Sequence, residues 1–403
     1  MKKNVQCVIL AAGEGARMRP LTATRPKVML PIVGKPLLEH LVRSIHDAGI
    51  HDILIVVGYQ EDTIRDWFGN GQSFGVSIRY VVQRQQKGTA DALLAAEPFI
   101  TGSFLMVNGD MIINSQDIQK IIASPAPTIA TFTTDHPENF GILTINGSLI
   151  TSLEEKSSSP KSNIINAGAY HFTPEIFSRI RQISLSERGE YELTDALTDY
   201  ILENKLTAYP LSLWIDVGYP WDMLTANETC LASLPELRMG TVEENVHITG
   251  SVSIGAGTVI KAGTYIEGPC LIGENTTVGP NAYLRPGTTI GNNCHIGHAV
   301  EIKNSIIFDN TKIPHYNYIG DSIIGSECNF GAGTKIANLR HDHTEVRVGT
   351  KGTGRKKFGA VIGDNVLFGI NCSINTGTSI GRGTRIGPHV LVHGIIEENT
   401  IIK

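Results

Sequence analysis

An aliphatic residue recurs at every sixth position through most of the second half of the chain. A period of six fits neither an α-helix, which repeats about every 3.6 residues, nor an isolated alternating strand. It predicts short strands joined by tight turns that coil into a parallel β-helix, with glycine at the corners. The series begins at Ile248 and runs through Ile254, Ile260, Ile266, Ile272, Val278, Leu284, Ile290, Ile296 and Ile302, then, with two one-residue slips, through Ile307, Ile313, Ile319, Ile324, Phe330 and Ile336, and after an interruption from Ile362 through Phe368, Ile374, Ile380 and Ile386 to Val392.

Small residues form a second column, two positions before the aliphatic ones. An inward position beside a large aliphatic side chain requires a small residue, so this column supports the coil. Four of the six cysteines fall in it and therefore have a packing role, and no CxxC spacing suggests zinc. The column comprises Thr258, Thr264, Cys270, Thr276, Ala282, Thr288, Cys294, Cys328, Thr334, Cys372 and Thr378.

The first half alternates short apolar strands with amphipathic helices. This order predicts an α/β domain with a Rossmann-like, mostly parallel sheet and helices on both faces. Ligands of such sheets gather at the carboxyl ends of the strands. The predicted strands are 5–12, 53–57 and 104–107, and the predicted helices are 37–48, 61–67 and 89–96.

Composition agrees with two domains and narrows the class of partners. A chain of 403 residues exceeds one ordinary domain. The net charge of −5 suggests no nucleic-acid or membrane-surface partner, and the apolar runs are too short for a membrane helix. The apolar start runs into a glycine-rich turn with no cleavage site, so we expect a cytoplasmic protein with reduced thiols. We place the domains at 1–225 and 241–403, with a helical linker at 226–240.

The turn after the first predicted strand reads Gly13-Glu14-Gly15-Ala16-Arg17. Backbone N–H groups in such a turn can approach a phosphate closely, and Arg17 and Lys27 are candidate counter-charges. Gly-x-Gly-x-Arg alone has low specificity. With Arg25-Pro26-Lys27 and Gly34-Lys35-Pro36 at these offsets, the pattern resembles the signature of sugar-1-phosphate nucleotidylyltransferases, over about residues 5–225.

This resemblance implies a complete site for nucleotidyl transfer. Arg17 and Lys27 would hold the triphosphate and stabilise charge on the leaving pyrophosphate. Asp110 and Asp216 would bind Mg²⁺, a hard cation that prefers oxygen ligands. Ala11-Ala12-Gly13 is most similar to uridylyltransferases, which favours UTP, with dTTP next. The residues implied at the nucleotide are Leu10, Ala11, Ala12, Gly13, Gln83, Gly88 and Thr89, and those at the sugar are Gly141, Glu155 and Asn166.

Arg285 and Lys303 are 18 residues apart, which is three hexapeptides and hence one full turn of a triangular coil. Each directly follows an inward residue, so we expect them to stack on adjacent coils about 4.8 Å apart. Two stacked cations on an otherwise neutral coil would form a phosphate clamp. The alternative is a pair of independent solvated charges.

Four segments of the coil resemble the acetyltransferase half of the bifunctional GlmU family, and the departures described below bring the pattern closer to its archaeal members. They are Ala282-Tyr-Leu-Arg-Pro-Gly, Val300-Glu-Ile-Lys, Pro314-His-Tyr-Asn-Tyr-Ile-Gly-Asp and Asn329-Phe-Gly-Ala-Gly-Thr. The resemblance implies an α/β Rossmann-like nucleotidyltransferase domain followed by an all-β left-handed parallel β-helix. It also implies a homotrimer.

The family resemblance implies two consecutive reactions. Glucosamine-1-phosphate would be acetylated by acetyl-CoA, and N-acetylglucosamine-1-phosphate would then react with UTP to give UDP-N-acetylglucosamine. His315 would be the general base that deprotonates the sugar ammonium. Arg285 and Lys303 would bind the sugar phosphate, with Tyr318 and Asn329 orienting the sugar and Ala332 and Asn338 towards the acetyl-CoA cleft.

The chain departs from bacterial members of the family after Asn338. Leu339 replaces a tyrosine, and because the sequence ends with the coil we expect no counterpart of the tail that covers acetyl-CoA in those enzymes. Residues 340–358 carry six basic side chains, which we interpret as contacts to CoA or sugar phosphates, with Lys357 nearest the family's lysine, or else as a solvated insertion. His341 and His343 fit a flexible polar loop better than a metal pair.

Two other functions remain open. A single-activity nucleotidylyltransferase for glucose-1-phosphate or mannose-1-phosphate would use the coil for oligomerisation alone. A non-enzymatic scaffold would leave Asp110 and Asp216 unexplained.

Overall fold

The computed structural model describes residues 5–157, 159–186 and 188–403, and the chain divides into two compact units. The first unit contains residues 5–14 and 37–216. The second contains Gly15–Pro36 and Val217–Lys403. The glycine-rich segment that leaves the first strand therefore belongs with the coil, and we call it the signature segment (15–36).

Within the described residues, the first unit is built on a nine-stranded mixed sheet in the order β5-β4-β1-β6-β11-β8-β12-β10-β9. Strands β5, β4, β1 and β6 run parallel, as the sequence predicts, whereas β11 is antiparallel to both β6 and β8. The prediction of a mostly parallel sheet is wrong for the part formed by β11, β8, β12, β10 and β9, in which β8 and β12 pair in parallel but the other pairs are antiparallel. Connections such as the short turn between β9 and β10 allow only antiparallel pairing. The strands are β1 (Gln6–Ala11), β4 (Asp52–Val57), β5 (Ser77–Val82), β6 (Phe104–Asn108), β8 (Thr128–Thr133), β9 (Gly141–Asn146), β10 (Leu149–Glu155), β11 (Ile164–Phe172) and β12 (Thr207–Pro210).

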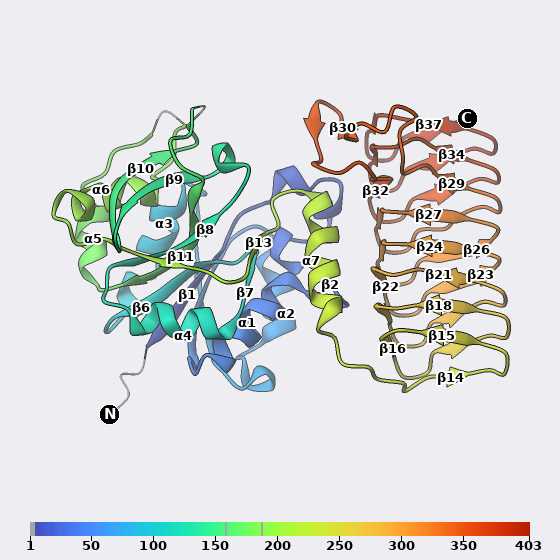
Figure 1. Ribbon diagram of the computed structural model, residues 1–403, viewed down its shortest axis with the longest axis horizontal. Helices are drawn as coiled ribbons and strands as arrows, with labels where there is room; N and C mark the ends of the chain where they lie inside the picture. Colours follow the sequence, from blue (N-terminus) through green and yellow to red (C-terminus); the bar gives the residue numbers. More distant parts are fainter. Residues whose placement is uncertain (1–4, 158, 187) are drawn as a thin grey trace. The chain divides into compact units, whose positions relative to one another are not determined.

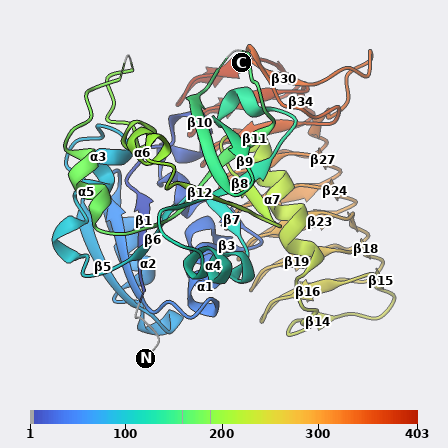
Figure 2. The ribbon, with the colours of Figure 1, turned by 60° about the vertical axis from the view of Figure 1, so that its left-hand side comes forward.

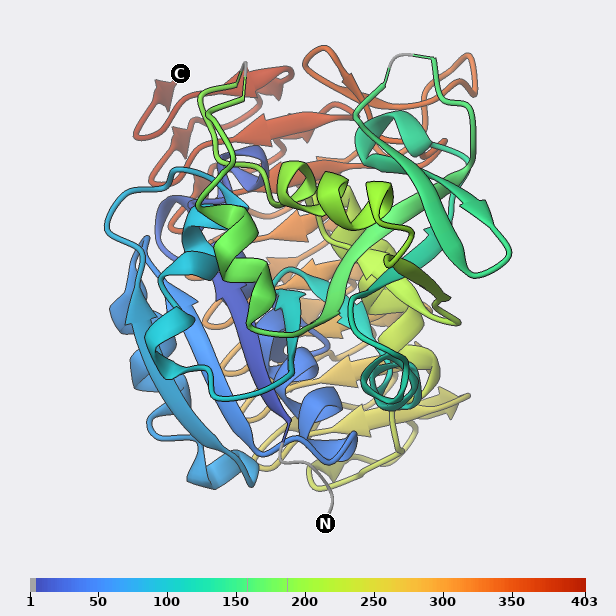
Figure 3. The same ribbon diagram turned by 90° about the vertical axis from the view of Figure 1, so that its left-hand side faces the viewer.

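Helices cover both faces of this sheet (Figures 1 to 3). Helix α1 (Leu37–Asp47) buries Leu37, Leu41 and Ile45, which lie on one side of a 3.6-residue repeat. It shares a face with α2 (Glu61–Phe68), while α3 (Thr89–Leu94), α5 (Glu175–Ile180) and α6 (Leu193–Leu202) pack together in one apolar core on the other. The predicted helices at 37–48, 61–67 and 89–96 are confirmed. The unit also contains α4 (Ser115–Ala123) and a two-stranded sheet of β7 (Met111–Ile113) and β13 (Trp214–Asp216).

The second unit is a left-handed parallel β-helix with three faces (Figure 1). The first face comprises β14 (Thr241–Val242), β17 (Val259–Ile260), β20 (Thr277–Val278), β23 (His295–His298), β26 (Lys312–His315), β33 (Leu367–Phe368), β36 (Arg385–Ile386) and β39 (Ile401–Ile402). The second comprises β15 (His247–Thr249), β18 (Tyr265–Glu267), β21 (Tyr283–Leu284), β24 (Glu301–Lys303), β27 (Tyr318–Gly320), β29 (Lys335–Ile336), β34 (Ser373–Ile374) and β37 (Leu391–Val392). The third comprises β16 (Val252–Ile254), β19 (Cys270–Ile272), β22 (Thr288–Ile290), β25 (Ile306–Ile307), β28 (Ile323–Ile324), β32 (Ala360–Ile362), β35 (Thr378–Ile380) and β38 (Ile395–Ile396).

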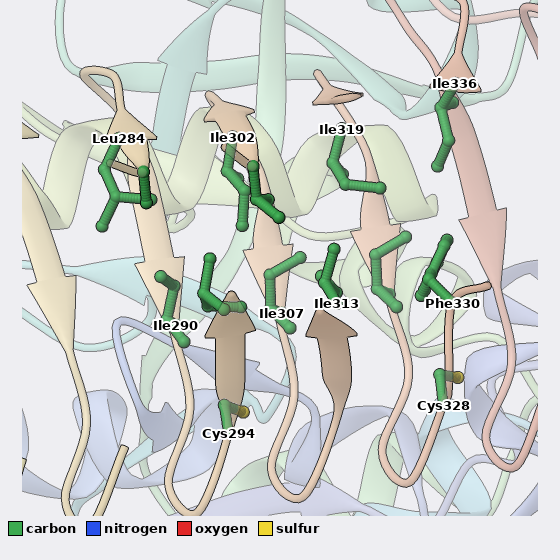
Figure 4. Close-up of a cluster of buried hydrophobic side chains, with 14 of the residues drawn as sticks. Leu284, Ile290, Cys294, Ile302, Ile307, Ile313, Ile319, Cys328, Phe330 and Ile336 are labelled. Carbon is green, nitrogen blue, oxygen red and sulfur yellow. The ribbon is translucent and has the colours of Figure 1, made fainter. Parts of the chain in front are cut away.

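Both predicted columns line the interior of the coil. Leu284, Ile302, Ile319 and Ile336 come from successive strands of one face and point into the same core (Figure 4). The small residues of the second column are buried as well, including the four cysteines assigned to it. Ile248, at the open end of the coil, is only partly buried. The six-residue period is thus confirmed as a packing pattern.

Helix α7 (Pro220–Ala232) leads into the coil and differs from the predicted linker at 226–240. It begins at a proline, and the Asp222 carboxylate accepts a hydrogen bond from the Tyr219 N–H at 2.7 Å, so both features fix its start. The helix and the signature segment both belong to the second unit. The signature segment comprises three short 3-10 turns, η1 (Ala16–Met18), η2 (Leu21–Ala23) and η3 (Lys27–Met29), and the strands β2 (Pro31–Ile32) and β3 (Lys35–Pro36). No helix in the described part of the chain is long and apolar enough to cross a membrane.

Candidate active sites

Asp110 and Asp216 are brought together by the pairing of β7 and β13. Asp216 lies opposite Met111, the residue that follows Asp110, although the two aspartates are far apart in sequence. Both side chains are partly exposed. Among the described residues they join no cluster of three or more potential ligands, so the protein offers two carboxylates. This donor set fits Mg²⁺, which is bound through one or two carboxylates and keeps several waters.

The loop after β1 is fixed by backbone contacts at the carboxyl ends of its neighbours. The Leu10 carbonyl accepts a hydrogen bond from the Gly109 N–H at 2.9 Å. The Ala12 carbonyl accepts from the Tyr59 N–H at 3.1 Å and from the Gln86 side-chain amide at 2.9 Å. The predicted nucleotide-binding residues 10–13 thus lie where an α/β sheet gathers its ligands.

The other predicted nucleotide residues form a compact group. The buried Gln83 amide donates to the Asp91 carboxylate at 2.8 Å and to the Gly88 carbonyl at 3.2 Å. Gly88 has φ +106°, and a Cβ there would lie 2.5 Å from the Tyr191 carbonyl oxygen, so this close approach requires glycine. The Thr89 hydroxyl accepts from the Leu193 N–H at 3.1 Å.

The predicted sugar residues converge on the pairing of β9 and β10. Gly141 lies opposite Glu155, and a Cβ on Gly141 would be 3.1 Å from the Glu155 carboxylate and 3.5 Å from the Asn166 side chain. Arg188 was not identified from the sequence because no motif surrounds it. Its guanidinium lies 3.4 Å from the Glu155 carboxylate and 2.7 Å from that of Glu192.

The predicted phosphate-binding cations lie in the signature segment. Lys27 is buried, and its side chain packs so closely on Gly15, which has φ +72°, that a Cβ there would be 2.6 Å from the Lys27 Cβ. The Arg17 guanidinium lies 5.1 Å from the centre of the Tyr219 ring, at the start of α7. Burial raises the pKa of Asp222 from 3.8 to about 6, while the Lys27 ammonium opposes that rise.

Arg285, which directly follows β21, and Lys303 of β24 lie on adjacent coils, as predicted from their spacing, because β21 pairs with β24 in the register that places Leu284 opposite Ile302. The prediction of an otherwise neutral coil is wrong. Arg285 forms an ion pair with Glu301 at 3.0 Å, and Lys303 forms one with Asp321 at 3.2 Å. Since a bare pair of stacked cations would repel, the carboxylates make this arrangement stable.

Asp321 connects several of the predicted residues. This buried carboxylate accepts hydrogen bonds from Lys303, from Asn338 and, at 2.9 Å, from Asn304. Burial raises the pKa of Tyr318, and the charges of Asp321 and Glu301 raise it further. Asn338, predicted towards the acetyl-CoA cleft, thus lies beside the predicted phosphate residues.

His315, Asn329 and Ala332 lie around a neighbouring corner of the coil. His315 ends β26 with an exposed side chain, opposite His298 on the coil before it. The Gly333 N–H donates to the His315 carbonyl at 3.0 Å, so the segment containing Ala332 passes directly beside His315. Asn329 pairs with Lys312 on the same face and is exposed.

The inserted segment 340–358 contains a short β-hairpin. Strands β30 (Arg347–Val348) and β31 (Lys351–Gly352) pair within it, and Lys357 is exposed beside Leu339. Arg355 forms an ion pair with Glu228 of α7 at 3.1 Å.

Other basic side chains of the hairpin also have partners in the chain. Arg340 pairs with Asp342 at 2.7 Å, and the Lys351 ammonium lies 5.2 Å from the centre of the Tyr219 ring. Some of the basic side chains predicted to contact CoA thus already interact with other residues of the second unit. His341 and His343 are exposed and join no metal-binding group among the described residues.

Comparison with known proteins identifies the class of each half. Residues 6–233 match the nucleotidyl transferase family, and residues 359–394 match the bacterial transferase hexapeptide family with six repeats. Residues 266–368 match the GMPPB C-terminal domain. A solved structure of a putative glucose-1-phosphate thymidylyltransferase from Bacillus anthracis in complex with a sucrose superposes with a TM-score of 0.53 at 30% identity, and covers 58% of this chain and 98% of that one. The chain is a nucleotidyltransferase joined to a hexapeptide-repeat transferase.

Full-length relatives define the family more closely. The chain is 44% identical over 405 residues to the bifunctional protein GlmU of Methanococcus maripaludis strain S2 and 41% identical over 403 residues to that of Methanocaldococcus jannaschii, in each case covering 99% of this chain and 97% of the relative. It is 40% identical over 398 residues to the bifunctional sugar-1-phosphate nucleotidylyltransferase/acetyltransferase of Sulfurisphaera tokodaii, with 96% and 97% covered. The chain belongs to the GlmU family of bifunctional enzymes and has both a nucleotidyltransferase and an acetyltransferase activity.

Proposed function

We propose that the enzyme acetylates glucosamine-1-phosphate with acetyl-CoA and transfers UMP from UTP to the resulting N-acetylglucosamine-1-phosphate, giving UDP-N-acetylglucosamine and pyrophosphate. The observation that carries the first reaction is the pair of cations on adjacent coils, Arg285 and Lys303, each held by a carboxylate beside Tyr318. A coil that served only for assembly has no need of this arrangement.

In acetyl transfer, His315 removes a proton from the sugar ammonium. The free amine attacks the carbonyl carbon of the acetyl-CoA thioester, the new C–N bond forms, and the C–S bond breaks. The departing thiolate takes up a proton, so CoA leaves as the thiol. Arg285 and Lys303 bind the sugar phosphate, Tyr318 and Asn329 orient the sugar, and Ala332, Asn338 and Lys357 face acetyl-CoA.

In nucleotidyl transfer, Arg17 and Lys27 bind the triphosphate and stabilise the charge that develops on the leaving pyrophosphate. The phosphate oxygen of the sugar-1-phosphate attacks the α-phosphorus in line, one P–O bond forms, and the bond to the β-phosphate bridge breaks. Residues 10–13 with Gln83, Gly88 and Thr89 bind UTP, whereas Gly141, Glu155 and Asn166 bind the sugar. Asp110 and Asp216 would hold Mg²⁺, which neutralises phosphate charge when bound.

The hexapeptide repeats support an oligomer, and we propose a homotrimer in the cytoplasm. The exposed position of His315, around a corner from Tyr318, leaves room for a neighbouring coil to complete the acetyltransferase site. Trimers of such coils would follow cyclic symmetry.

A second candidate is a single-activity nucleotidylyltransferase for mannose-1-phosphate or glucose-1-phosphate. The match of residues 266–368 to the GMPPB C-terminal domain and the likeness to a putative thymidylyltransferase favour it. It would leave His315, Arg285 and Lys303 without a role in chemistry.

Separate assays of the two products distinguish these functions. With acetyl-CoA and glucosamine-1-phosphate, His315→Ala should lower release of the CoA thiol by about 10²-fold or more, the range for loss of a general base. Pyrophosphate release from UTP and N-acetylglucosamine-1-phosphate should be unchanged. Asp110→Asn should lower pyrophosphate release and leave CoA release unchanged.

His298→Ala is the matched control, since this half-buried histidine lies one coil away on the same face. It should leave CoA release near the wild-type rate. A folded wild-type protein that releases pyrophosphate but no CoA would establish the single-activity alternative. CoA release that survives His315→Ala would refute the choice of base.

A further inference from the structure

The carboxylate of Asp364, on the coil, receives hydrogen bonds from the signature segment. Its Oδ2 accepts from the Thr24 hydroxyl at 2.5 Å and from the Arg25 guanidinium at 2.6 Å. Its Oδ1 accepts from the Ser326 N–H at 2.7 Å. Since Asp364 is only 5% exposed, these contacts are shielded from water, where a charge-assisted hydrogen bond is strong.

The corner position of Asp364 has counterparts in earlier coils. They allow its hydrogen bond to the coil backbone to be considered apart from its contact with Arg25. The Asn292 side-chain oxygen accepts from the Glu274 N–H at 2.7 Å, and the Asp309 carboxylate accepts from the Asn292 N–H at 2.7 Å. An asparagine therefore caps this corner as well as an aspartate does. The negative charge at position 364 is not needed by the coil, and its partner is Arg25.

Arg25 is held on a second side by the coil. Its guanidinium lies 5.4 Å from the centre of the buried Phe308 ring and 3.5 Å from the Ser326 hydroxyl. The side chain is thus enclosed by an aromatic face, a hydroxyl and the Asp364 carboxylate. This environment fixes one guanidinium orientation.

The far end of the signature segment is anchored to the same unit. The Val33 N–H donates to the side-chain oxygen of Asn227 at 3.2 Å, and the Thr289 hydroxyl donates to that oxygen at 2.8 Å. The Asn227 amide donates to the Gly287 carbonyl at 2.9 Å, so this fully buried residue joins α7, the coil and the segment. Between the two anchors, the segment carries Lys27, two residues after Arg25.

We propose that Asp364 is a positioning residue for nucleotidyl transfer, because through Arg25 it fixes the segment that carries Arg17 and Lys27. The inference rests on the proposed function, which assigns these two cations to the triphosphate. A displacement of about 1 Å in a positioning group can lower a rate 10²-fold.

Substitution of the charge alone tests this in the full-length enzyme. Asp364→Asn keeps the corner cap, as Asn292 shows, and removes the partner of Arg25. We expect kcat for pyrophosphate release to fall about 10- to 100-fold, with CoA release within twofold of wild type. Asp309→Asn, the same change at a corner without a contact to the signature segment, should leave both rates unchanged.

The double variant supplies a readout that general destabilisation would not give. If Asp364 acts through Arg25, then Arg25→Gln should lower pyrophosphate release similarly, and the double variant should fall no further than the single ones. Additive losses, equal losses of both activities, or a wild-type rate in Asp364→Asn would overturn the inference. A wild-type enzyme that releases no pyrophosphate would instead refute the proposed function, so the two failures are distinguishable.

Discussion

At the scale of single residues, buried carboxylates hold basic side chains of the coil and of the signature segment in place. Asp321 holds Lys303 and Asn338 in one group, and Asp364 holds Arg25. In each case the carboxylate is buried and the cation is more exposed. The buried acidic residue thus sets the orientation of its basic partner.

Removal of the Asp321 charge should weaken binding of the sugar phosphate. In Asp321→Asn, Lys303 loses its ion pair and regains rotamer freedom, so we expect KM for glucosamine-1-phosphate to rise about 10-fold, with a smaller change in kcat. The measurement is initial CoA release against sugar concentration. Glu267→Gln changes a carboxylate on the same face that accepts from Tyr283, and serves as the control. A change confined to kcat would contradict a binding role.

Asp222 should make stability depend on pH. Because burial raises its pKa to about 6, the folded protein keeps this proton over a range, about pH 4 to 6, in which the unfolded chain has lost it. Its contribution to the free energy of unfolding therefore falls as pH rises through that range, by about 1.4 kcal/mol per pH unit. Between pH 4.5 and pH 7, the free energy of unfolding of Asp222→Asn should therefore rise by roughly 2 kcal/mol relative to that of wild type.

Denaturant unfolding at pH 4.5 and pH 7 measures this difference. Asp309→Asn, at an exposed corner, is the comparison. An equal effect of Asp222→Asn at both pH values would show that the carboxyl titrates alike in the folded and unfolded chain.

At the scale of elements, stability of the coil should depend on its aliphatic column. Ile302 is fully buried between Leu284 and Ile319 of the adjacent strands. Ile302→Val should lower the free energy of unfolding by about 0.5–1.5 kcal/mol, and Ile302→Ala by about 2–5 kcal/mol because a cavity remains. Thermal unfolding of the full-length protein checks the order. Equal losses in the two variants would mean that the neighbours collapse into the space.

The sequence could predict the elements that repeat and the motifs that lie on them. The period of six located the coil strands, and the 18-residue spacing placed Arg285 beside Lys303. The expectation that Asp110 and Asp216 act together followed only from the family resemblance, because nothing in the sequences of β7 and β13 indicates that these two strands pair. The antiparallel strands after residue 110 and the partners of Arg285 and Lys303 were missed, because each depends on contacts without a periodic signal.

At the scale of the whole molecule, the order of residues does not follow the division into units. The signature segment separates two parts of the sheet unit in the sequence and yet packs with the coil. Arg25 and Asp364 are 339 residues apart, so composition and spacing gave no indication of their contact. The domain boundary expected near residue 225 therefore divides the sequence in two, but it does not separate the two compact units.

Because the signature segment belongs to the same unit as the coil, its contacts with the coil form late during synthesis on the ribosome. Strands β1, β4 and β6 can pair as soon as residue 108 has emerged, since domains fold as the chain is made. Thr24 and Arg25, however, meet their partner only after residue 364 has been translated. For most of the elongation time the nascent chain thus holds a paired sheet while Thr24 and Arg25 lack their contact with Asp364, which forms only together with the last coils.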